Sequence, residues 1–99
     1  MNLLNLPKLP LSEELTTILV KNKNVIIEQI ISTGQVSDWY DQEKSEFVIL
    51  LEGNAEIEYE NAAVVPLIKG DTLLITPHQK HRVVYTSCEP PCIWLCVYF

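Results

Sequence analysis

The chain has 99 residues, a formal net charge of −6 and only seven lysines and arginines, and 47% of its residues are hydrophobic. This length fits one domain, and the hydrophobic content is typical of a folded chain rather than a disordered one. The acidic balance disfavours nucleic acid and anionic membrane surfaces as partners, because both require clustered positive charge.

The N-terminal segment is apolar but does not resemble a signal peptide. It lacks a basic start, and Pro7 and Pro10 interrupt it. No stretch approaches the roughly 20 apolar residues that span a bilayer. The three cysteines, Cys88, Cys92 and Cys96, are odd in number and match no zinc-binding spacing, which fits a reducing compartment. We therefore expect a cytoplasmic protein.

Residues 1–24 are expected to form an extended arm and a short helix that pack on the main domain. Ser12 is a suitable N-cap, and Glu13 and Glu14 would lie in the first turn, where the helix dipole favours negative charge. The buried stripe of this helix, predicted over residues 12–20, would be Leu11, Leu15, Ile18 and Leu19.

From residue 25 onward the sequence has the two-residue period of β-strands. Strands are expected at residues 25–32, 47–51, 55–60, 64–68, 72–75, 81–86 and 93–99, with a short extended segment through Trp39 and Tyr40. Pro66 predicts an edge position for its strand, and Gly53-Asn54 predicts a hairpin turn. About eight short strands at this spacing are typical of a sandwich or barrel. We predict a single all-β domain, a barrel or jelly roll, over residues 25–99.

Two of the predicted strands, residues 47–51 and 93–99, are apolar on both faces. A barrel wall buries only one face of each strand. The N-terminal arm or a second copy of the chain must therefore cover the other face. We expect a homodimer.

Two motifs give the chain a family resemblance. Gly34, the triplet Tyr40-Asp41-Gln42, Glu46 and Gly53 have the spacing of a glycine, a His-x-His pair, a glutamate and a second glycine. Gly70-Asp71, an apolar stretch, Pro77 and His81 follow a second pattern, with Thr76 at the usual proline position and His78 at that of a glycine. With these motifs the chain resembles the cupin superfamily, in particular its small single-domain members. The resemblance implies a cupin-type β-barrel.

The resemblance also implies a site with an altered set of ligands. Metal-binding cupins hold one divalent ion with the two histidines of the first motif, the glutamate and the second-motif histidine. This chain keeps Glu46 and His81 but has Tyr40 and Gln42 in place of the two histidines. An amide oxygen and a neutral phenol are poor ligands for Fe, Mn, Ni or Zn. Any metal site, made by Gln42, Glu46 and His81, is expected to be weak.

The candidate site residues each have a plain alternative. His81 shares a strand face with Val83 and Tyr85 and should point into the barrel, as a ligand contact or as a satisfied core histidine. Glu46 begins an apolar strand and needs a partner, which could be a metal, His81 or the Gln42 amide.

Six further residues complete this assignment. Tyr40 and Gln42 lie on one face of an extended segment, where they could bind a polar ligand or only satisfy each other and the backbone. His78 is placed at the pocket rim as a further ligand contact. Arg82 should face outward, in a salt bridge or a dimer contact. Trp39 and Trp94 are assigned to the core or to an interface.

Three functions remain open from the sequence. The first is a barrel that binds a small-molecule ligand through Tyr40, Gln42, Glu46 and His81. The second is a metal-dependent enzyme of dioxygenase or isomerase type with a weak divalent site. The third is a metal-free enzyme in which Glu46 and His81 act as general acid and base. The missing histidines favour the first.

Overall fold

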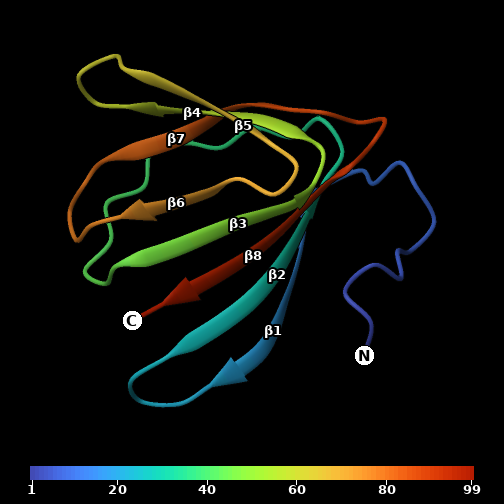
Figure 1. The fold of residues 1–99 in the computed structure, drawn as a ribbon, viewed down its shortest axis with the longest axis horizontal. Helices are drawn as coiled ribbons and strands as arrows, with labels where there is room; N and C mark the ends of the chain where they lie inside the picture. The colour runs from blue at the N-terminus through green and yellow to red at the C-terminus, as the bar shows by residue number, and fades with distance from the viewer.

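The computed structural model describes residues 1–99 as eight antiparallel strands and no helix (Figure 1). One sheet has the strand order β1-β2-β8-β3-β6 and the other has the order β5-β4-β7. The strands are β1 (Leu15–Lys21), β2 (Ile26–Ser32), β3 (Glu46–Glu52), β4 (Asn54–Tyr59), β5 (Val64–Ile68), β6 (Thr72–Ile75), β7 (His81–Thr86) and β8 (Cys92–Tyr98). The predicted all-β barrel or jelly roll is confirmed, and no helix is present that could cross a membrane.

The predicted N-terminal helix at residues 12–20 is wrong. Leu15–Lys21 is the edge strand β1, which pairs with β2 in the register Thr16 to Ile30. The segment is rich in β-branched residues, which fit a pleated sheet better than a helix. Pairing with β2 also satisfies backbone groups that an uncovered β2 edge would leave open. The sheet therefore begins at Leu15 and not at residue 25.

The core fills the space between the two sheets. Trp94 belongs to the core, which was one of its two predicted positions, the core or an interface. Its indole Nε1 donates a hydrogen bond to Ser32 Oγ at 3.2 Å. A buried indole N–H needs such a partner, and the neighbouring strand β2 supplies it from a diagonal position, since Ser32 pairs with Cys92 and Trp94 pairs with Ile30. The buried core residues are Val48, Leu50, Ala55, Ile57, Leu67, Ile75, Cys92, Trp94 and Cys96.

The alternation predicted for β7 holds for its first half only. His81 is buried and pairs with Tyr59, and Val83 pairs with Ile57. A register shift then follows, and Tyr85 pairs with Glu56 and is exposed. The extra residue turns Tyr85 outward, so its predicted inward position is wrong. Pro66 does lie in an edge strand, as expected, since β5 ends its sheet.

Candidate functional site

A cavity of about 150 Å³ lies between the two sheets. Tyr40, Gln42, Glu46 and His81 all line it, so the structure brings these four predicted residues to one place. Glu46 is the first residue of β3 and His81 the first of β7, whereas Tyr40 and Gln42 belong to the segment that precedes β3. The first motif therefore supplies three of the four side chains, and the second motif supplies the fourth.

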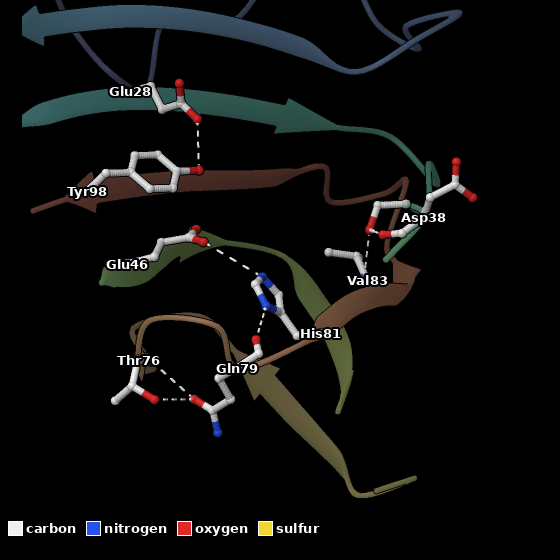
Figure 2. Close-up of polar contacts among 9 residues, drawn as sticks. Glu28, Asp38, Glu46, Thr76, Gln79, His81, Val83 and Tyr98 are labelled. Atoms are coloured by element: carbon white, nitrogen blue, oxygen red, sulfur yellow. Dashed lines mark hydrogen bonds and ion pairs between the residues drawn. The ribbon is translucent and has the colours of Figure 1, made fainter. Parts of the chain in front are cut away.

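Glu46 and His81 face each other across the cavity (Figure 2). Their closest atoms, Glu46 Oε1 and His81 Nε2, are 3.8 Å apart, beyond hydrogen-bond distance. Both residues are buried, with exposed fractions of 7% and 3%. His81 Nδ1 lies 2.9 Å from the carbonyl oxygen of Gln79. Because a carbonyl only accepts, Nδ1 carries a proton and Nε2 is the nitrogen turned toward Glu46.

Burial raises the pKa of the Glu46 carboxyl above its ordinary value. The neighbouring polar groups of Cys96 and Gln42, and then His81, offset part of this effect. A carboxyl with a raised pKa keeps its proton to higher pH and can exchange it with a facing imidazole or a bound molecule. The pair is therefore capable of acid–base chemistry.

The segment that carries Tyr40 and Gln42 is fixed to the start of β7. The Tyr40 N–H donates to the His81 carbonyl at 2.7 Å, and the His81 N–H donates back to the Tyr40 carbonyl at 3.2 Å. The Gln42 carbonyl accepts a hydrogen bond from the His78 N–H at 2.7 Å. These backbone contacts hold the Tyr40 ring 5.5 Å from the His81 ring, centroid to centroid. The position of the cavity wall is thus set by the backbone.

The Gln42 side chain is left without a full set of partners. Its Nε2 is buried and has no acceptor in hydrogen-bond geometry, and no other buried side-chain nitrogen or oxygen shares this condition. The Glu46 carboxyl is close enough for the amide to lower its pKa, but the two groups are not aligned as a hydrogen bond. This condition does not favour the alternative in which Tyr40 and Gln42 only satisfy each other and the backbone. A buried donor without an acceptor points to a bound molecule or a water in the cavity.

The structure adds two carboxylates that were not predicted from the sequence. Glu28 from β2 lines the cavity and accepts a hydrogen bond from the Tyr98 hydroxyl at 3.0 Å (Figure 2). Glu14, just before β1, also lines it and accepts a hydrogen bond from Ser32 Oγ at 2.8 Å. The available signal was a glutamate at residue 28, between Ile26 and Ile30 on the inward face of β2.

His78 lies outside the cavity, although it was predicted at the rim as a ligand contact. Its exposed ring places Nδ1 2.7 Å from Asp41 Oδ1. The residue has a φ of 59°, in the left-handed region. That conformation explains why the motif has a glycine here, because glycine adopts it without strain.

Arg82 faces outward, and the predicted salt bridge is confirmed. Its Nη2 lies 2.6 Å from Glu58 Oε1. The guanidinium carbon also lies 4.6 Å from the centre of the Trp39 ring. Trp39 is exposed and packs on this arginine, so it does not belong to the core.

The donor atoms in the cavity do not fit a resident divalent metal. At the four motif positions, Glu46 and His81 are the two conventional ligands. Glu14 and Glu28 also line the cavity, but no group of three His, Cys, Asp or Glu side chains gathers closely enough to hold one ion. Burial, and next the charge of Glu14, raises the pKa of the Tyr40 phenol, so it stays protonated at neutral pH. The remaining donors, a neutral phenol and an amide, bind such ions poorly.

Two antiparallel sheets enclose a cavity that is mostly apolar and carries a few polar side chains, so the chain belongs to the class of small β-barrels with an internal pocket. The family model for the cupin domain matches residues 27–98, and the chain belongs to the cupin family.

Solved structures agree with this assignment. A candidate mannose-6-phosphate isomerase from Ralstonia eutropha is 35% identical, with a TM-score of 0.92 over 99% of this chain and 94% of that one. A cupin superfamily protein from Desulfitobacterium hafniense is 16% identical, with a TM-score of 0.82 over 94% and 83%. An RmlC-like cupin from Desulfovibrio desulfuricans is 20% identical, with a TM-score of 0.78 over 99% and 92%. No curated protein matches the chain.

Proposed function

We propose that this cupin binds a small polar molecule in the cavity lined by Tyr40, Gln42, Glu46 and His81. The observation that carries this proposal is the buried Gln42 Nε2 without an acceptor. Leaving such a group unpaired costs about 1–3 kcal/mol. An oxygen of a bound molecule would accept from this nitrogen and remove that cost.

The size and charge of the cavity limit the ligand. A cavity of about 150 Å³ is close to one that holds benzene, so the ligand has few heavy atoms. No lysine or arginine lines it. The Ralstonia eutropha protein is named for a sugar phosphate. Phosphate groups are typically bound by lysine or arginine side chains or by a helix N-terminus, and this cavity has none of these. His81 is the one lining side chain that can become cationic, and it lies among three glutamates, so we do not propose that substrate here.

A second candidate is metal-free acid–base catalysis on the bound molecule. The observation that favours it is the Glu46 carboxyl, whose pKa is raised, beside the Nε2 atom of His81. The metal-dependent alternative, of dioxygenase or isomerase type, is not favoured, because only two conventional ligands meet here. Stoichiometric Fe, Mn, Ni or Zn in protein purified without added metal would reverse this order.

Replacing Gln42 with leucine should weaken ligand binding about tenfold, because a hydrogen bond worth about 1–1.5 kcal/mol is lost. Small polar compounds that raise the melting temperature of the wild type would be selected first. Their dissociation constants would then be measured by calorimetry for both proteins. Asn24→Leu, an amide-to-alkyl exchange in the exposed turn after β1, serves as the matched control. Equal affinity of the wild type and Gln42→Leu for every selected compound would place binding elsewhere.

The outer face of the five-stranded sheet supports a homodimer as part of the proposal. A row of apolar side chains crosses all five strands there, and its two end members, Val20 and Leu74, are 46% and 50% exposed. The N-terminal arm covers the neighbouring part of this face, where Gln29 Nε2 donates to the Leu3 carbonyl at 2.6 Å. A second copy related by a two-fold axis would cover the row itself. The row is Val20, Ile27, Val97, Phe47 and Leu74.

Replacing Leu74 with lysine should weaken the dimer about 100-fold or more, because a buried unpaired charge costs several kcal/mol. Light scattering should give twice the 11.3 kDa chain mass for the wild type and the single mass for the variant. Ile68→Lys, at an exposed position of β5 in the other sheet, should leave the dimer intact. A wild type that is monomeric at high micromolar concentration would contradict this prediction.

A further inference from the structure

The cavity gathers acidic side chains, and the binding of an unspecified polar molecule does not explain why they are there. Glu14, Glu28 and Glu46 line it from three different parts of the chain. Lys44 lines a neighbouring surface hollow, and Arg82 points away to Glu58. His81 is thus the one side chain in the lining that can carry a positive charge.

The side chain of Glu46 is about nine-tenths buried, and its carboxyl lies beside Cys96 and Gln42 but accepts no hydrogen bond of normal geometry. His81 Nε2, the nearest basic atom, is at 3.8 Å, too far for a hydrogen bond. Burying a carboxylate is costly unless it is paired. Glu28 has one partner, the Tyr98 hydroxyl, which leaves acceptor capacity on its carboxylate. The group that would complete both carboxylates is a cation with several N–H donors.

Aromatic side chains complete the lining. Tyr40, Trp94 and Tyr98 all border the cavity. The pKa of Tyr40 and that of Tyr98 are both raised, first by burial and next by Glu14 and Glu46 respectively, so both phenols stay neutral. Carboxylates combined with neutral aromatic rings form a favourable surrounding for ammonium groups. The same surrounding repels anions.

We infer that the cavity binds a small organic cation, an amine of a few carbons that also carries a hydroxyl or carbonyl oxygen. Its ammonium group would donate to Glu46 and Glu28, and its oxygen would accept from Gln42 Nε2. The inference rests on the proposed function, since it names the class of molecule held in the same cavity. Its size follows from the cavity volume of about 150 Å³.

Three probes of nearly equal size test the sign of the ligand charge. Ethanolamine is cationic at neutral pH, ethylene glycol is neutral and glycolate is anionic. Calorimetry or ligand-observed NMR should show ethanolamine binding at least tenfold tighter than ethylene glycol, with glycolate weakest. Glu46→Gln should weaken ethanolamine binding about tenfold or more and change ethylene glycol binding by about twofold at most. Glu28→Gln should act in the same direction.

The controls separate this inference from the proposed function. Glu56→Gln removes one negative charge on the exposed face of β4 and should leave ethanolamine binding unchanged. If ethylene glycol or glycolate binds as tightly as ethanolamine, the inference of a cationic ligand is wrong. If Gln42→Leu still weakens the binding of that probe, the proposal that the cavity binds a small polar molecule is retained. If both glutamate variants fold and bind ethanolamine like the wild type, or if ethanolamine does not bind at millimolar concentration, the inference is overturned.

Discussion

Replacing Tyr40 and Gln42 together with histidine should raise the affinity for Ni²⁺ or Zn²⁺ about 100-fold or more. All four positions border one cavity, and Glu46 and His81 already face each other there. Two imidazoles would replace a neutral phenol and an amide, and each good ligand adds of order tenfold or more, by comparison with the effects of groups around metal ligands. The variant should retain metal through gel filtration, measured by elemental analysis, where the wild type does not.

The gain in metal affinity should depend on the side chains that line the cavity and not on nearby residues outside it. Adding His81→Ala to the double variant should remove the gain, because one of the four ligands is then lost. Adding Asp41→Ala, which removes the partner of the exposed His78, should leave the gain intact. A folded double variant without improved metal affinity would mean that the four side chains do not converge closely enough to hold one ion.

The sequence was sufficient to predict most strands and to name four residues that line one cavity. Turn residues and the alternation of apolar and polar residues locate β2 to β8. Each of these strands buries at least one face, and that face is visible in the sequence as apolar residues at every second position. Glu46 and His81 are predicted as site residues by the motifs that resemble those of cupins. In the structure each begins a strand, and both side chains line the same cavity. These are local properties of the chain, and the fold preserves them.

The features that could not be predicted depend on contacts distant in sequence. Residues 15–21 have both helical and strand patterns, and pairing with β2 decides between them. Tyr85 turns outward because of a register shift against β4, which no local pattern reveals. Glu14 and Glu28 reach the cavity because β1 and β2 continue the sheet beside β8, an order that the sequence does not state.

Replacing Gly53 with alanine should lower the free energy of unfolding by about 3–5 kcal/mol, a large part of the stability of a small domain. Gly53 closes the first motif and has a φ of 93°, which costs about 1–3 kcal/mol for a residue with a side chain. An added Cβ would also lie 2.7 Å from the Pro91 carbonyl oxygen and 2.8 Å from Cys92 Cα and Sγ. Backbone atoms at the start of β8 cannot move away without disturbing its pairing. Urea unfolding measures the loss.

Gly70→Ala separates the two contributions. Gly70 has nearly the same φ, 90°, but an added Cβ would meet no heavy atom within 4 Å. This variant should lose only the cost of the backbone conformation, about 1–3 kcal/mol. A clearly larger loss at Gly53 would show that the glycine is needed for the close approach of the β3–β4 turn to β8. This approach holds β3 and β8 in place, and these strands carry Glu46 and Trp94 in the wall of the cavity. Equal losses would mean that β8 yields to the methyl group and that the turn conformation alone requires glycine.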